Sequence, residues 1–61
     1  MEFKIGVNDA EILEESFLTY EEAYDYCTRN LYNPAKYFKI DIEERDEDGE
    51  TVSVSTVYEE E

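Results

Sequence analysis

Histidine is absent from this chain of 61 residues, and cysteine and proline occur once each. Without histidine the commonest general base of enzymes is missing, and the single cysteine, Cys27, has no imidazole to activate it as a nucleophile. Cys27 also cannot form an internal disulfide, so the crosslinked scaffolds of small secreted proteins are excluded. Zinc sites lack their usual Cys and His ligands. We therefore expect a protein that is not an enzyme and has no cofactor and no metal site.

Cations are also scarce, with five Lys and Arg against 18 Asp and Glu, which gives a net charge of −13. Such a charge repels nucleic acid and anionic membranes, because binding to phosphates depends on Lys and Arg, and it attracts basic protein surfaces. No stretch approaches the ~20 apolar residues of a membrane span. The first residues, MEFKIGV, show no basic or long apolar region of a signal peptide. We expect a cytoplasmic protein whose partner is a basic protein, with no direct binding to nucleic acid or membrane.

Apolar residues are frequent enough for a folded domain. A hydrophobic fraction of 41%, with six Tyr and three Phe, exceeds what a disordered acidic segment contains. A chain of this length forms one domain and buries only about 60% of its unfolded surface, so its stability should be marginal. We expect residues 1–58 to form this domain and residues 59–61 to be a frayed acidic tail.

The hydrophobic pattern predicts an α+β fold, a small antiparallel sheet with one helix packed on one face, in the order strand, strand, helix, strand, strand. Residues 2–7 alternate polar and apolar side chains, which predicts the first strand. Residues 11–17 predict a second strand with a rougher pattern. We expect Leu13 and Phe17 to point inward from it.

A helix is predicted to begin after Thr19, because Thr19 and Glu22 have the spacing of a capping box. The face expected to be buried holds Tyr20, Ala23, Tyr24, Cys27 and Leu31. Asp25 and Arg29 are spaced for an ion pair on the exposed face. The helix is expected to run to about Asn30 or Leu31, and Asn30, Asn33 and Pro34 are expected to end it.

Residues 37–43 and 51–58 predict a hairpin of two strands. Placing Ile42 opposite Val54 leaves Glu47-Asp48-Gly49 as a three-residue loop with Gly49 in the left-handed conformation. A two-residue turn would pair Ile42 with Ser55 and split the apolar faces. We therefore expect the first register, which also sets Ile40 beside Thr56 and Phe38 beside Tyr58.

The hairpin loop resembles part of a calcium site. With Gly49 at the sixth position of an EF-hand loop, however, Ser55 stands where a bidentate Glu is required. The flanking segments are also predicted strands rather than helices. We therefore expect a turn and no calcium site.

The acids concentrate in the last third of the chain. Residues 41–61 hold ten acids and one base, whereas residues 1–40 hold eight acids and four bases. Alternate residues on a strand lie ~6.6 Å apart, so outward carboxylates continued by the turn would form a row with a pitch comparable to that of nucleic-acid phosphates. The helix offers a second row. The candidate phosphate surrogates are Asp41, Glu43, Glu44, Asp46, Glu47, Asp48 and Glu50 in the hairpin and Glu21, Glu22 and Asp25 on the helix.

In size, acidity and α+β fold, the whole chain resembles the small proteins that bacteriophages make to disable host DNA-binding proteins by imitating DNA. Within that class it looks most like the dimeric acidic kind that a Bacillus phage directs at the histone-like protein HU. The resemblance implies an inhibitor that occupies the DNA-binding surface of a basic host protein such as HU, in the host cytoplasm and as a homodimer. The bases that interrupt the acidic surface are Lys4, Arg29, Lys36, Lys39 and Arg45.

Two other functions stay open. A regulatory adaptor would bind a host enzyme such as a polymerase or a protease through exposed tyrosines and an almost uncharged strip on the last strand. The tyrosines are Tyr26, Tyr32 and Tyr37, and the strip is Ser53, Ser55 and Val57. The strip or a strand edge would also serve as a dimer contact. The third function is a small acidic domain whose charges provide solubility.

Overall fold

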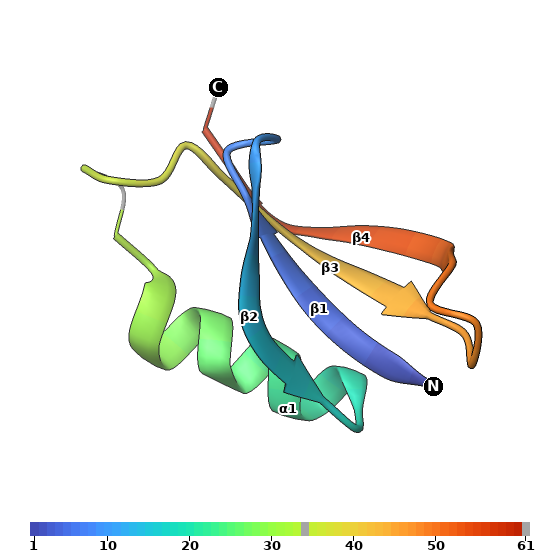
Figure 1. The fold of residues 1–61 in the computed structure, drawn as a ribbon. Coiled ribbons are helices and arrows are strands. Elements are labelled where there is room, and N and C mark those ends of the chain that lie inside the picture. The colour runs from blue at the N-terminus through green and yellow to red at the C-terminus, as the bar shows by residue number, and fades with distance from the viewer. Residues whose placement is uncertain (34, 61) are drawn as a thin grey trace.

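One four-stranded antiparallel sheet carries a helix on one face (Figure 1). The computed structural model describes residues 1–33 and 35–60, so only Pro34 of the residues expected to end the helix lies outside the described residues. The elements are β1 (Glu2–Val7), β2 (Glu11–Phe17), α1 (Tyr20–Tyr26), the π-helical turn η1 (Cys27–Leu31), β3 (Lys39–Arg45) and β4 (Thr51–Glu59). The strands lie in the order β2-β1-β3-β4, which makes β2 and β4 the edges. The α+β class and the element order are confirmed.

The core lies between the helix and the two central strands. Its buried side chains are Ile5, Val7, Ala23, Cys27, Ile40 and Ile42. Residues opposite each other in an antiparallel pair share a face, and Ile5 pairs with Ile42 and Val7 with Ile40. Leu13 and Phe17 pack partly buried against this cluster. The inward face predicted for β2 is therefore confirmed.

The helix begins as predicted, with Thr19 Oγ1 accepting a hydrogen bond from the amide of Glu22 at 3.1 Å. The predicted ion pair between Arg29 and Asp25 is also present, at 2.8 Å. Both contacts are predictable from the sequence, because they join residues three or four positions apart on one helix.

The buried face of the helix differs in part from the prediction. Ala23 and Cys27 are buried, but Tyr20 and Tyr24 are 40% and 46% exposed. Tyr26, expected to be partly exposed at the helix edge, is partly buried against the core, with its ring centroid 5.2 Å from that of Phe17. The contact line runs through the small residues, where the helix can approach the sheet most closely. Tyr20 and Tyr24 are consequently displaced to the rim, where their rings stack on each other.

The loop of the β3–β4 hairpin matches the prediction. The amide of Asp46 donates to the carbonyl oxygen of Glu50 at 3.0 Å, and Gly49 has φ +83°. The three-residue loop with a left-handed glycine is therefore confirmed.

The predicted register of the hairpin is wrong. The pairing of β3 with β4 shifts by one residue between Glu44 and Arg45 and again between Ile40 and Asp41. The first shift places Ser55, rather than Val54, opposite Ile42, and the second places Tyr58 opposite Ile40. The predicted pairs of Ile40 with Thr56 and of Phe38 with Tyr58 are also wrong, because the amide of Glu60 donates to the Phe38 carbonyl.

The shifts change which side chains of β4 reach the core. Val57, expected on the outward strip, packs partly buried against the core together with Tyr58. Val52 and Val54 are 53% and 57% exposed. Phe38, expected inward, precedes β3 and is half exposed.

The end of the chain is paired further than expected. Glu59 is the last residue of β4 and lies opposite Lys39. The backbone bond from Glu60 extends this pairing by one residue. Glu59 and Glu60 are therefore paired with the segment that leads into β3, and Glu61 lies outside the described residues.

Candidate acidic binding surface

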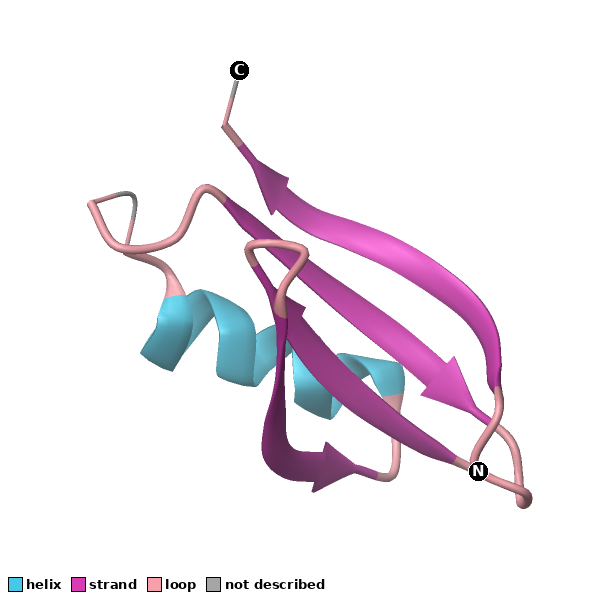
Figure 2. Ribbon diagram, turned by 45° about the horizontal axis from the view of Figure 1, so that its top comes forward, coloured by secondary structure: helices cyan, strands magenta, loops and turns pink. Residues whose placement is uncertain are grey.

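The start of α1 and the tip of the β3–β4 hairpin lie at the same end of the molecule (Figures 1 and 2). Leu18, just before the helix, lines a shallow hollow together with Asp46, Glu47 and Gly49 of the hairpin. Both segments carry exposed acids. The acidic end, as we call it, consists of Glu21, Glu22, Glu47, Asp48 and Glu50. The sequence placed these residues in two separate rows, and the fold brings them together.

Asp46 holds the hairpin part of the acidic end in shape. Its Oδ1 atom accepts hydrogen bonds from the amide of Asp48 at 2.9 Å and from the amide of Glu50 at 3.0 Å. The amide of Gly49 donates to the Asp46 carbonyl oxygen at 3.0 Å. Through these bonds Asp46 fixes the shape of the loop that carries the neighbouring acids.

The expected row of open carboxylates along β3 is not formed. Asp41 and Glu43 lie on the face of the sheet without the helix, but Asp41 is only 9% exposed and accepts from Thr56 Oγ1 at 3.2 Å. Glu43 accepts from Thr51 Oγ1 at 2.9 Å and lies 3.9 Å from Arg45. Both acids are therefore bound within the sheet.

The other two candidates are also removed from such a row. Glu44 follows Glu43 directly on β3, so it points to the opposite face of the sheet, where the Ser53 hydroxyl donates to it at 3.4 Å. Asp25 is engaged by Arg29 on the helix surface.

The cations lie mostly at the other end of the molecule. The end of the helix, the following loop and the start of β3 carry Arg29, Lys36 and Lys39, and these segments lie away from the hairpin tip (Figure 1). Lys36 lies over the ring of Tyr37, 5.2 Å from its centroid. Within residues 1–33 and 35–60, no ion pair involves a member of the acidic end.

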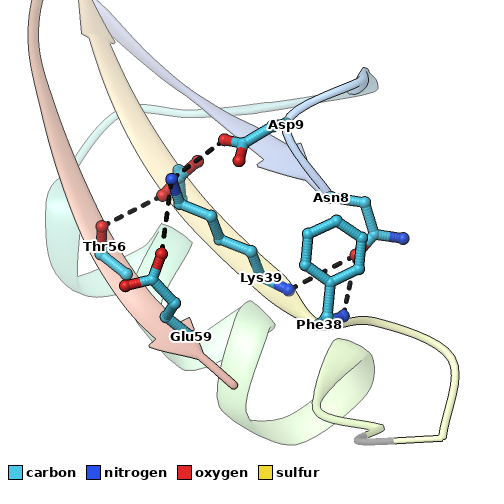
Figure 3. Close-up of polar contacts among 7 residues, drawn as sticks. Asn8, Asp9, Phe38, Lys39, Thr56 and Glu59 are labelled. Carbon is cyan, nitrogen blue, oxygen red and sulfur yellow. Dashed lines mark hydrogen bonds and ion pairs between the residues drawn. The ribbon is translucent and has the colours of Figure 1, made fainter. Parts of the chain in front are cut away.

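A clasp between the β1–β2 turn and β3 fixes Lys39 in this position (Figure 3). Asn8 Oδ1 accepts from the amides of Phe38 at 2.8 Å and Lys39 at 3.4 Å. Lys39 Nζ lies 3.0 Å from Asp9 and 3.8 Å from Glu59. The hydrogen bond to Asp9 raises the pKa of Lys39, partly offset by desolvation. The charge of Lys39 is thereby balanced locally.

Tyrosines form a second surface feature beside β4. A groove between the helical region and this strand is lined by Tyr24, Thr28, Tyr32, Val57 and Tyr58, with Cys27 and Ile40 beneath. Tyr32 is 56% exposed, and its ring lies edge-on to that of Tyr58 with centroids 5.1 Å apart. Of the expected tyrosines only Tyr32 lines the groove, since Tyr26 and Tyr37 pack against the core. Tyr24 and Tyr58 escaped prediction because their sequence pattern is typical of core residues.

Cys27 is held as a neutral thiol. Burial raises its pKa from 9.0 to about 11, so the thiolate needed for nucleophilic attack is disfavoured. Across the described ranges, no three His, Cys, Asp or Glu side chains are placed to hold a metal ion together. The same ranges contain no helix that has both the length and the apolar character to cross a bilayer.

No family model, curated protein or solved structure matches this chain.

Proposed function

We propose that this protein is a non-enzymatic inhibitor that acts as a DNA mimic and occupies the DNA-binding surface of a basic protein. The observation that carries the proposal is the convergence of five exposed carboxylates at the acidic end, away from most of the cations. DNA-binding surfaces present Lys and Arg to neutralise phosphates, and a fixed group of carboxylates offers them similar charges. A histone-like protein such as HU is a target of this chemistry.

The dimensions of the molecule limit the size of the proposed contact. Its extents are 34 × 20 × 17 Å. One helical turn of DNA spans about 34–36 Å. Because the acidic end is only one end of this length, the proposed contact covers less than the path of one turn of the duplex.

The test is displacement of a short labelled DNA duplex from purified HU-type protein. The protein should displace the duplex at low salt, and displacement should weaken steeply as salt increases. The matched variants remove three charges each without changing size. The acidic-end variant carries Glu47→Gln, Asp48→Asn and Glu50→Gln, and the control carries Glu11→Gln, Glu14→Gln and Glu15→Gln on β2.

We expect the acidic-end variant to bind at least about tenfold more weakly and the control to change much less, because charges contribute most where they meet the partner. Equal weakening by both variants would mean that only net charge acts, which contradicts a defined contact surface. The target class is tested by capture from a bacterial lysate. If no captured DNA-binding protein is released by duplex DNA, the mimicry is wrong.

A regulatory adaptor is the second candidate, and the groove beside Tyr32 and Tyr58 favours it. An apolar contact of this kind with a host polymerase or protease would withstand salt. Tyr32→Ser would weaken such binding, whereas the acidic-end variant would leave it unchanged. The same capture experiment separates the two functions, because a partner of the groove resists elution by both salt and DNA.

A further inference from the structure

The two edges of the sheet differ in how they are protected. On β2, the edge carries Glu11, Glu14 and Glu15, and its pairing with β1 is irregular. Charges and irregular pairing are common protections against the addition of a further strand. On β4, residues 51–58 carry no charge, and the segment Ser53–Thr56 between its two irregularities is regularly paired. The middle of β4 is therefore the unprotected edge.

Two backbone hydrogen bonds show toward which neighbouring strand the N–H and C=O groups of β3 point. The Lys39 carbonyl accepts from the amide of Asn8, beyond the end of β1, and the Phe38 carbonyl accepts from the amide of Glu60, beyond the end of β4. Backbone direction alternates along a strand. The backbone N–H and C=O groups of odd-numbered residues of β3 therefore point toward β1, and those of even-numbered residues point toward β4.

This alternation identifies the free groups of the edge. Ser53 and Ser55 lie opposite even residues of β3, so their backbone groups point toward β3. Val54 and Thr56 lie opposite odd residues and direct their N–H and C=O groups to the outer side. In the described part of the chain β4 has no neighbouring strand on that side. A further strand would find these donors and acceptors ready to pair.

Acids stand at both ends of this edge, with Glu47, Asp48 and Glu50 before it and Glu59 and Glu60 after it. A second copy paired antiparallel with Val54 opposite Val54 would set Asp48 of one copy beside Glu60 of the other. Like charges placed opposite each other destabilise such pairing. A strand with cations at its ends and an uncharged centre has the complementary charge pattern.

We propose that β4 binds an extended segment of a basic partner as a fifth strand, with Lys or Arg at both ends of the segment and β-branched residues in its centre. Backbone bonds give such a contact its affinity, and pockets for alternate side chains give its selectivity. The groove of Tyr24, Tyr32 and Tyr58 lies beside the same strand and would receive one apolar side chain of the partner. That this segment belongs to a basic DNA-binding protein rests on the proposed function, whereas the place of contact and its charge pattern rest on the edge itself.

The probe is a capped synthetic peptide with two lysines at each end and alternating valine and threonine at the four central positions. Its control replaces one central valine by proline, which keeps the charge and prevents regular strand pairing. We expect the first peptide to bind at least about tenfold more tightly and to slow amide hydrogen exchange of Val54 and Thr56 by at least about tenfold. Ser53 and Ser55 should already exchange slowly in the free protein.

A pair of protein variants tests the same contact. Val54→Pro removes an outward N–H and should abolish binding of the peptide, whereas Val54→Thr keeps the donor and should bind as the original protein does. Circular dichroism checks that both variants fold. If Val54→Pro does not fold, the exchange experiment on the original protein decides.

The possible results separate this proposal from the proposed function. Equal binding of both peptides without protection of Val54 and Thr56 would assign the contact to charge alone, which overturns strand addition and leaves DNA mimicry standing. Binding of neither peptide would also overturn strand addition. A dimer in sedimentation, with the amides of Val54 and Thr56 protected in the absence of peptide, would overturn it as well, because the edge would then be occupied by a second copy. Peptide pairing together with failure to displace DNA would overturn the mimicry only.

Discussion

The amide nitrogen of Phe38 lies 2.8 Å from Oδ1 of Asn8, a residue that precedes it by 30 positions in the chain. Asn8 adopts φ 56°, in the left-handed region that asparagine tolerates better than most residues. Its side chain thus closes the clasp that positions the start of β3.

Replacing Asn8 separates the contribution of its side-chain hydrogen bonds from that of its left-handed backbone conformation. Asn8→Gly removes the side-chain hydrogen bonds and should lower the free energy of unfolding by about 1 kcal/mol. Asn8→Ala removes the same bonds and adds left-handed strain, so its loss should be about 2 kcal/mol. Urea denaturation measures both. A smaller loss for Ala than for Gly would contradict the role of the backbone conformation.

The turn at Asp46 offers a second test. Asp46→Ala removes the acceptor of two backbone amides and should lower the free energy of unfolding by about 1–2 kcal/mol. Asp46→Asn keeps an oxygen acceptor at the same place and should lose less than half as much. If the two variants are equally unstable, the charge of Asp46 rather than its acceptor geometry holds the turn.

Burial of Cys27 gives a pH dependence with a defined sign. The pKa of its thiol is raised from 9.0 to about 11, so the folded protein keeps this proton at a pH where the unfolded chain loses it. The associated stability is fully present below pH 9 and is lost as pH rises toward 11. Cys27→Ala should show a smaller decline in stability over that range. An equal decline in the two proteins would exclude Cys27 as the titrating group.

The same shift controls the reactivity of the thiol. Two pKa units change the thiolate fraction by about 100-fold, so iodoacetamide near neutral pH should alkylate Cys27 at least about 100-fold more slowly in the folded protein than in urea. Rates followed by mass spectrometry check this. Similar rates in the two states would mean that the thiol is accessible in the fold.

The register of the hairpin predicts a contrast between two apolar residues. Ile42 is 2% exposed and Val54 is 57% exposed. Ile42→Ala should therefore lower the free energy of unfolding by about 3 kcal/mol, and Val54→Ala by about 0.5 kcal/mol. Under the register expected from the sequence, both residues would face the core. A loss above about 2 kcal/mol for Val54→Ala would favour that register.

Crowding of charge at the acidic end should itself reduce stability. The variant with Glu47→Gln, Asp48→Asn and Glu50→Gln relieves repulsion, so its melting temperature at low salt should exceed that of the original protein. The gain should shrink at high salt, where the repulsion is screened. Glu43→Gln is the contrasting variant, since it weakens the contact with Arg45 and should lower the melting temperature.

Local chemistry explains which parts of the fold were predictable. The capping of α1 by Thr19 depends on residues within one turn. The left-handed position of the hairpin loop is also predictable, because glycine adopts a positive φ without steric cost and Gly49 is the glycine of this loop. The register of β4 was not predictable in this way. In the segment VSVSTV both faces hold small or β-branched side chains, so a period of two gives no sign of an inserted residue.

The candidate site was predictable as a set of acids but not as an arrangement. Whether Asp41 is open or bound depends on Thr56, which the register of β4 brings beside it. The meeting of the helix start with the hairpin tip depends on the crossing of the helix over the sheet (Figure 2). Sequence spacing carries no information on such contacts between distant segments.

The lack of ion pairs at the acidic end has a further consequence for the first approach to a partner. The five carboxylates of the acidic end take part in no ion pair of the described residues, whereas Arg29 and Lys39 at the other end are paired with Asp25, Asp9 and Glu59. The field of a basic surface attracts these uncompensated carboxylates before any contact forms, and it turns the hairpin tip forward. Productive collisions would thus depend on orientation, and salt would slow association more than it hastens dissociation.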